Sequence, residues 1–236
     1  MSARAVAALL AVGAVAVTSG CHALRGREAA VPAANPDGLL PGLPTGGTRA
    51  DRDTAARLIR RLPVARRGPK TGYSRERYGQ EWTDSVQGVP LSGNGCGTRD
   101  DMLARDGKAI EYAKGSRCVV QAMSLRDPYT GRTVKWSRAR SGEVQVDHVV
   151  PLSYAWRMGA ARWPEAKRLR FANDPLNLLP VDGRANADKG GRGPAAWLPP
   201  WRHVRCAYVT RFAQVTVKYG LPVSRRDRAV MLAQCR

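Results

Sequence analysis

Five cysteines limit the folds open to this chain more than any other feature, because disulfide bonds between them would fix which segments of the chain lie together. Cys21 directly follows an apolar run, and the others are Cys96, Cys118, Cys206 and Cys235. Four cysteines allow three pairings. We expect the two local ones, Cys96–Cys118 and Cys206–Cys235, since each closes a short loop inside a separate unit. A zinc site is the alternative, but the sequence has no CxxC pair and export favours oxidation.

An apolar run without charge, Ala5–Val17, follows Arg4 at the N-terminus. It is too short to span a bilayer and fits the apolar region of a signal peptide. The next residues, Thr18 to Cys21, resemble a bacterial lipobox, although Leu is usual where Thr18 stands. We expect residues 1–20 to be a signal peptide and Cys21 to carry a lipid at the outer face of the cell membrane. Ordinary cleavage and secretion is the alternative. Lipidation of Cys21 would leave an even number of cysteines.

The chain is strongly basic, with 39 Lys and Arg against 19 Asp and Glu and a formal net charge of +20. Most of the basic residues are Arg, a bias that GC-rich coding can produce. Residues 51–236 nevertheless keep most of the excess positive charge. The electrostatic field of such a charge attracts polyanions: nucleic acid, anionic lipid or acidic wall polymer. Charge alone does not choose among them. The hydrophobic fraction of 43% is enough for a packed core.

The pattern along the chain predicts a flexible tether followed by one α+β domain. Residues 21–50 are rich in Pro, Gly and Ala, which is typical of a tether, and residues 51–236 form the domain. A capping box at Thr98 and Asp101 is expected to open a helix. Residues 64–95 are expected to be irregular. We expect helices at about 55–62, 98–105, 152–159, 164–172, 202–219 and 224–235, and strands at 118–126, 132–136, 144–150 and 176–181.

Asp147 and His148 stand together near the end of the predicted strand 144–150. Asn177 lies at the start of the next predicted strand, and Asn186 follows on a polar helical turn. Neighbouring residues of a regular strand point to opposite faces. Asp147 and His148 therefore face one phosphate only if the strand ends or bends beside them.

This order of strand, insert, strand, turn and short helix resembles the HNH (His-Me finger, ββα-metal) nucleases, in the variant whose third motif residue is Asn. The wider sequence resembles exported bacterial HNH proteins that belong with the C-terminal nuclease domain of GmrSD-type restriction enzymes. The resemblance implies a ββα-metal core at about 143–190, with an added β-hairpin and C-terminal helices. It rests on the segments GCGTRDDMLARD, DPYTG, VDHVVPLSYAW, FANDPLNLLPVDGRANADKG and AAWLPP.

The chemistry of phosphodiester hydrolysis explains why these residue types are needed. A neutral imidazole titrates near operating pH, so His148 suits the role of general base. Asp147 and Asn186 supply oxygens to one divalent cation, for which Mg²⁺ is expected and Mn²⁺ is possible. By analogy with the family, Asn177 is not a ligand and its amide braces the loop between the strands.

The expected function is that of a metal-dependent HNH endonuclease, a monomer that cleaves DNA with little sequence preference and meets the membrane only through its lipid anchor. Two alternatives remain: a non-catalytic surface protein that binds anionic polymers on an HNH-derived fold, and a phosphodiesterase acting on RNA or a small nucleotide. A Ser-His-Asp triad with Ser153 is disfavoured, because the sequence has no nucleophile elbow. Asp188 and His203 are expected to be surface or framework residues. Candidates for phosphate contacts are Arg184, Lys189 and Arg192.

Overall fold

The computed structural model describes residues 35–236. The predicted signal peptide, the lipidation site Cys21 and residues 21–34 of the predicted tether lie outside this range. None of the helices in the described range is both long and apolar enough to cross a membrane.

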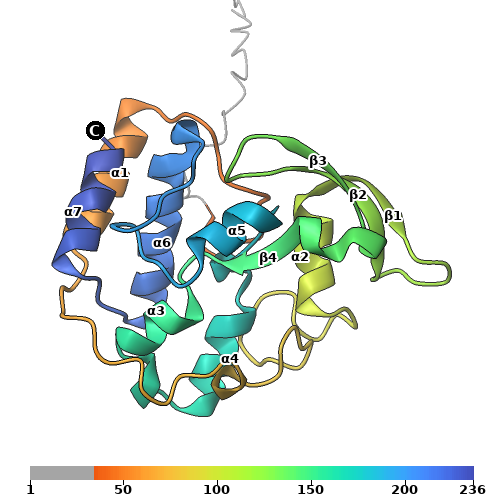
Figure 1. Cartoon of the computed structure of the whole chain (residues 1–236), viewed down its shortest axis with the longest axis horizontal. Helices are drawn as coiled ribbons and strands as arrows, with labels where there is room; N and C mark the ends of the chain where they lie inside the picture. Colours follow the sequence, from red (N-terminus) through yellow and green to blue (C-terminus); the bar gives the residue numbers. More distant parts are fainter. Residues whose placement is uncertain (1–34) are drawn as a thin grey trace, which may run out of the picture.

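Helices form one side of the molecule, and α1, α6 and α7 lie together there (Figure 1). Apolar residues at helical spacing on α6, from Tyr208 to Tyr219, are buried because they face the other helices. Ser224 caps α7 by accepting a hydrogen bond from the backbone amide of Asp227. The helices are α1 (Arg49–Arg60), α2 (Thr98–Asp106), α3 (Leu152–Arg157), α4 (Glu165–Asn173), α5 (Gly183–Lys189), α6 (Arg205–Tyr219) and α7 (Arg225–Gln234).

Two antiparallel sheets complete the fold. β1 (Gly107–Tyr112), β2 (Val120–Arg126) and β3 (Thr133–Ser137) form a three-stranded sheet in that order, at the side opposite α1, α6 and α7 (Figure 1). β4 (Val144–His148) pairs with β5 (Leu178–Asp182), and α5 follows β5 directly. This β4–β5–α5 unit matches the expected order of two strands and a short helix.

The two sides have separate hydrophobic clusters. The larger one joins α1, α3, α6 and α7 around aromatic residues such as Tyr154, Phe171 and Phe212. The smaller one lies between the three-stranded sheet and α2, and includes Leu103, Trp136 and Leu178. The β4–β5 pair contributes to both clusters. The candidate site therefore sits where the two halves meet.

One local expectation is wrong, and one strand was not expected. Thr98 does not cap α2: Gly97 is the N-cap, and the Thr98 hydroxyl donates to the Thr83 carbonyl at 2.9 Å. The capping box belongs to Thr48 and Asp51, at the start of α1. β1 is a strand that the sequence pattern did not indicate. Most of its residues are exposed, so no apolar alternation marks it, and it forms by pairing with β2.

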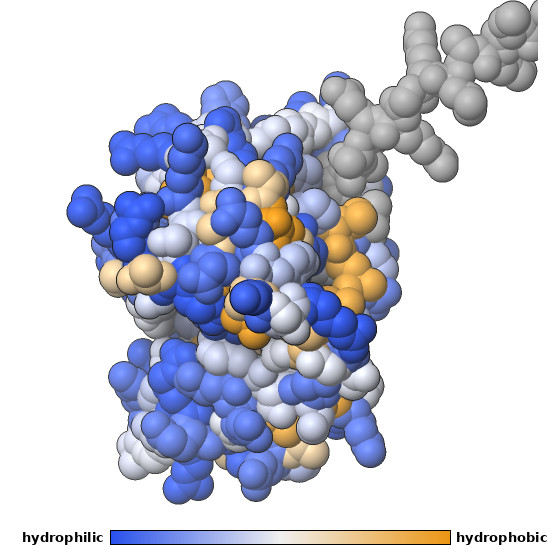
Figure 2. All heavy atoms as spheres, turned by 90° about the vertical axis from the view of Figure 1, so that its right-hand side faces the viewer, coloured by the Kyte–Doolittle hydropathy of each residue, from blue (hydrophilic) through white to orange (hydrophobic). Residues whose placement is uncertain are grey.

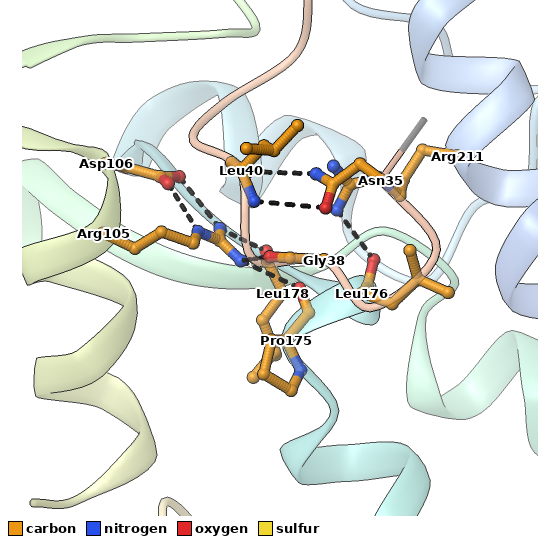
Figure 3. Close-up of polar contacts among 9 residues, drawn as sticks. All are labelled: Asn35, Gly38, Leu40, Arg105, Asp106, Pro175, Leu176, Leu178 and Arg211. Atoms are coloured by element: carbon orange, nitrogen blue, oxygen red, sulfur yellow. Dashed lines mark hydrogen bonds and ion pairs between the residues drawn. The ribbon is translucent and has the colours of Figure 1, made fainter. Parts of the chain in front are cut away.

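The predicted tether boundary at residue 50 also requires correction, because residues 35–43 pack on the domain. The Arg105 guanidinium donates to the carbonyls of Gly38 at 2.6 Å, Pro175 at 2.9 Å and Leu178 at 2.8 Å (Figure 3). Gly38 has φ of +72°, and a Cβ there would come within 2.2 Å of the Leu176 backbone nitrogen. Composition suggested flexibility, but backbone hydrogen bonds and close contact hold this segment in place.

Disulfides join Cys96 to Cys118 and Cys206 to Cys235, the two local pairings expected from the sequence. The first links the segment before α2 to the segment before β2. The second links α6 to the end of α7. Figure 2 shows that the face bearing the three-stranded sheet is mostly hydrophilic, with apolar patches of limited size.

Candidate active site

The face of β4 that carries Gln145 and Asp147 packs against α5. These two residues are two positions apart, so both side chains point to the same side of the strand. Asn186 and Lys189 are three positions apart on α5 and share one helix face. Asn186 Nδ2 donates to Gln145 Oε1 at 2.8 Å, and Lys189 Nζ donates to Asp147 Oδ2 at 2.7 Å. Strand and helix periodicity together bring Asp147 and Asn186 to the same side.

Asp147 is buried and strongly held through one oxygen. Besides Lys189, the Tyr129 hydroxyl donates to Asp147 Oδ2 at 2.6 Å. Lys189 is fully buried and also donates to the carbonyl of His148 at 2.7 Å. Burial lowers the pKa of Lys189, and the Asp147 carboxylate opposes that shift. Lys189 therefore neutralises Asp147 and fixes its orientation.

His148 is the last residue of β4, so the strand ends at the site, as the geometry requires. Its ring is held from the side opposite α5. Nε2 lies 2.8 Å from the carbonyl oxygen of Ala172, and Trp82 stacks on the ring at 5.9 Å between centroids. A carbonyl only accepts, so Nε2 carries the proton and Nδ1 keeps a lone pair. Burial lowers the pKa of His148 to about 3, which leaves the ring neutral.

Asn177 is fully buried beneath the site and joins three backbone segments. Its Oδ1 accepts from the Val150 amide at 2.8 Å, and its Nδ2 donates to the carbonyls of Val150 at 3.4 Å and Phe171 at 3.3 Å. The Val149 amide also donates to the Asn177 carbonyl at 2.7 Å. These contacts hold the chain that leaves β4 against the chain that enters β5.

The oxygens of Asp147 and Asn186 suit a hard divalent cation. Asp147 uses Oδ2 for its hydrogen bonds, and Asn186 uses Nδ2. The Oδ1 atom of each side chain makes no hydrogen bond to another described residue. Across residues 35–236 there is no cluster of three or more His, Cys, Asp and Glu side chains that would hold a metal. One carboxylate and one amide nevertheless fit Mg²⁺, which keeps several waters and takes further oxygens from substrate phosphates.

An open cleft of about 320 Å³ brings the candidate residues together. Asp147, His148 and Asn186 all line it, with Gly190 and Gly191 at the end of α5. Ser153 lies close to Gly191, whose Cβ, if it had one, would come within 2.2 Å of the Ser153 hydroxyl. A side chain at position 191 would therefore require the Ser153 hydroxyl to move.

The three candidates for phosphate contacts have different environments. Lys189 is buried on Asp147, so its expected role in binding substrate is wrong for a physical reason: its ammonium already has two partners. Arg184 is exposed on the far side of α5, beside a groove that also includes Lys135. Arg192 is half-exposed and pairs with Asp188 at 3.0 Å.

The other residues considered have ordinary surroundings. Asp188 is an exposed charge that accepts from Arg192 and from the Trp197 indole at 2.9 Å. His203 is exposed and lies outside the cleft. Among the described residues, Ser153 has no hydrogen bond to His148, so no triad is formed.

Sequence reasoning missed two residues that hold the site. Tyr129 belongs to the segment DPYTG, one of those that carry the family resemblance. Its neighbours in the sequence give no sign that its hydroxyl contacts Asp147. Burial and the Asp147 charge raise the pKa of Tyr129 well above its usual value, so its hydroxyl stays a donor. Trp82 comes from the irregular segment before α2. Both contacts are long-range, and no spacing rule reports them.

A family model and a fungal protein match most of the domain. The family model described as GmrSD restriction endonucleases, C-terminal domain, matches residues 97–234, more than half of the chain. A protein of Arthroderma benhamiae, described as an "Uncharacterized secreted protein", is 36% identical over 191 residues, which cover 80% of this chain and 87% of that protein. No solved structure matches. The relative is fungal, so the resemblance is not confined to bacteria. The chain belongs to the family of the C-terminal domain of GmrSD restriction endonucleases.

Proposed function

We propose that this protein is an exported, metal-dependent endonuclease of the HNH type that cleaves DNA with little sequence preference. The observation that carries the proposal is the cleft itself, in which Asp147, His148 and Asn186 lie together. The family match supports nuclease chemistry, and the cationic surface supports a polyanionic substrate. Backbone contacts explain how such a site binds DNA without reading its bases.

His148 is the proposed general base. Its Nε2–H is engaged by the Ala172 carbonyl, so Nδ1 is the atom that removes a proton from the attacking water. The stacked Trp82 ring limits rotation of the imidazole. An anionic phosphate bound beside the ring would raise its pKa toward the range where proton abstraction is efficient.

Asp147 and Asn186 would hold the divalent cation, most simply Mg²⁺, through their Oδ1 atoms. The cation would supply charge neutralisation at the phosphate and at the leaving oxygen. Lys189 and Tyr129 keep Asp147 aimed at the cleft, and Asn177 braces the loop that positions His148.

Export is part of the same proposal. The relative from Arthroderma benhamiae is described as secreted, and the two disulfides suit an oxidising compartment. Lipidation of Cys21 and a monomeric state remain proposals, tested by the mass of the mature N-terminus and by sedimentation.

Plasmid digestion tests the function directly. The chain without its signal peptide, carrying Cys21→Ser, should nick or linearise plasmid with Mg²⁺ and not with EDTA. His148→Ala should lower turnover by roughly 10²–10⁴-fold, the usual contribution of a general base. His203→Ala removes an exposed histidine outside the cleft and is the matched control.

The alternatives predict different results from that assay. DNA binding without cleavage under any divalent cation would favour the non-catalytic polymer-binding protein. Cleavage of RNA or of a small phosphodiester, with plasmid left intact, would replace DNA as the substrate. Cleavage unchanged by His148→Ala would reject the HNH mechanism.

A further inference from the structure

The chain between α1 and α2 contributes one wall of the candidate active site. Lys70, Tyr73 and Arg75 line the same cleft as Asp147 and His148. These three residues precede residue 97, where the match to the family model begins. The family resemblance assigned them no role. Their position at the cleft raises the question of what this added wall binds.

This wall is fixed in position although it has almost no regular structure. Gly68 exchanges two hydrogen bonds with Arg157, from its own amide at 2.8 Å and from Arg157 Nε at 2.9 Å. The Trp156 indole donates to the Thr71 carbonyl at 3.1 Å, and the Tyr78 hydroxyl donates to the Leu152 carbonyl at 2.7 Å. Every one of these contacts attaches the segment to α3. The segment is therefore preorganised around the cleft.

Lys70 is an exposed cation without a neutralising carboxylate in the described part of the chain. It has no ion pair among the described residues, and its ammonium lies 5.3 Å from the centre of the Tyr73 ring. The Tyr73 amide donates to the Lys70 carbonyl at 3.0 Å, which closes the turn between them. The edge of the Tyr73 ring packs against Trp156 at 6.1 Å between centroids. Tyr73 thus gives Lys70 a defined position through a cation–π contact.

Arg75 is the second cation of this wall. Its Nε lies 2.8 Å from Glu81 Oε1, and both side chains are about half exposed. Exposed pairs of this kind contribute little free energy, so a phosphate can replace Glu81 at low cost. Among residues 35–236, Asp147 is the one acidic residue that lines the cleft, and it is already paired with Lys189. The local field of the cleft is therefore positive.

We propose that Lys70 and Arg75 bind phosphates of the nucleic-acid strand next to the phosphate that is cleaved, and that Tyr73 is a positioning residue for Lys70. This inference rests on the proposed nuclease function, since it takes the cleft as the place of cleavage. Two cations on a rigid wall, beside a general base and two metal-binding oxygens, form a phosphate-binding subsite. The subsite recognises the backbone and not the bases.

Binding and cleavage are measured separately to test it. Fluorescence anisotropy of a short DNA duplex in EDTA gives Kd and its salt dependence without any catalysis. Lys70→Gln and Arg75→Gln should each weaken binding about tenfold, which corresponds to one charge-assisted hydrogen bond. Each should also lower the slope of log Kd against log salt by about 0.9. In the cleavage assay, KM should rise about as much while kcat changes less than about threefold.

Controls separate the subsite from general charge effects. Lys114→Gln and Arg66→Gln remove exposed cations that do not line the cleft, and both should stay near the wild-type Kd. Tyr73→Phe should behave as wild type, because the ring that holds Lys70 remains. Tyr73→Leu should weaken DNA binding. When Lys70→Gln is combined with Tyr73→Leu, the further loss of affinity should be small, because Tyr73 acts through Lys70.

The outcomes distinguish this inference from the nuclease proposal. If Lys70→Gln and Arg75→Gln leave Kd, salt slope and KM unchanged while His148→Ala stops cleavage, the subsite is wrong and the nuclease stands. If the wild type never cleaves but both variants bind DNA more weakly than the two controls, the binding site is supported and the nuclease proposal fails. If Lys114→Gln and Arg66→Gln weaken DNA binding as much as Lys70→Gln and Arg75→Gln do, the losses come from net charge alone. That result would overturn the subsite.

Discussion

Asp147 and His148 are adjacent in the chain, yet their side chains are held from opposite faces of β4. Tyr129 and Lys189 hold Asp147 from the α5 side, while Trp82 and the Ala172 carbonyl hold His148 from the other side. Because β4 ends at His148, both side chains reach one cleft. Because successive side chains of a strand point to opposite faces, different residues contact Asp147 and His148.

The assignment of the metal-binding residue on α5 is tested by two substitutions. Asn186→Ala should lower cleavage and raise the Mg²⁺ concentration needed for half-maximal rate by roughly 10-fold or more, because one protein oxygen is lost. Asp188→Ala is the matched control, since Asp188 is exposed and bonded to Arg192 and Trp197. A Mg²⁺ titration of the cleavage rate measures both. Normal cleavage by Asn186→Ala together with impaired cleavage by Asp188→Ala would move the ligand two residues along α5, from Asn186 to Asp188.

At the scale of elements, the segment before α1 is part of the fold. Removal of residues 35–47 takes away the Gly38 carbonyl from Arg105 and exposes the surface that Leu43 covers. Loss of a charged hydrogen bond and of an apolar contact should together lower the free energy of unfolding by roughly 2–4 kcal/mol. Urea denaturation of chains starting at residues 35 and 48 compares the two. Equal midpoints would mean that the segment contributes nothing.

The Cys206–Cys235 bridge connects α6 to the end of α7. It closes a loop with a sequence separation of 29 residues, for which the chain-entropy model gives about 3–4 kcal/mol. Replacing both Cys206 and Cys235 with Ser should lower the free energy of unfolding by about that amount. Urea denaturation at fixed pH measures the difference. The same experiment on Cys96–Cys118, with a separation of 22, should give a similar loss. A negligible loss in both would mean that packing alone holds these elements.

For the molecule as a whole, Asp227 is a junction between distant parts of the chain. Its buried carboxylate accepts from Arg67 at 2.8 Å, from the Tyr154 hydroxyl at 3.0 Å and from the Ala195 amide at 2.9 Å. Burial raises the pKa of Asp227, but the hydrogen bonds from Ser224, Arg67 and Ala195 outweigh burial and lower it overall. Folding therefore favours the ionised form.

A lowered pKa fixes the direction of the pH effect. The stabilisation is present above the pKa of the unfolded carboxyl, about 3.9, and is lost as the pH falls through the lower folded value. Asp227→Asn should lower stability at pH 7 by roughly 3 kcal/mol, as when one partner of a buried pair is removed. Urea titrations at pH 7 and pH 3 should show this difference shrinking at the lower pH, while exposed Asp188→Asn stays near wild type throughout. A difference independent of pH would assign the effect to packing.

The sequence by itself determined the local elements and the order of the candidate residues. The helical stripe on α6, the cap of α7 and the strands β4 and β5 follow from periodicity and capping, which depend on residues a few positions apart. The motif order from Asp147 to Asn186 is local in the same sense, and so the candidate site could be found without a structure. The two disulfides follow from parity and short loops.

Only the tertiary structure decided which residues support that site and surround it. Tyr129, Lys189 and Trp82 reach Asp147 or His148 from segments 18 to 66 positions away, and no local pattern encodes a contact at that distance. The packing of residues 35–43 and the strand β1 could not be predicted from the sequence for the same reason. Their residues are polar, exposed or rich in Gly and Pro. Hydrogen bonds from distant parts of the chain hold them, from the Arg105 side chain to Gly38 and from the backbone of β2 to β1.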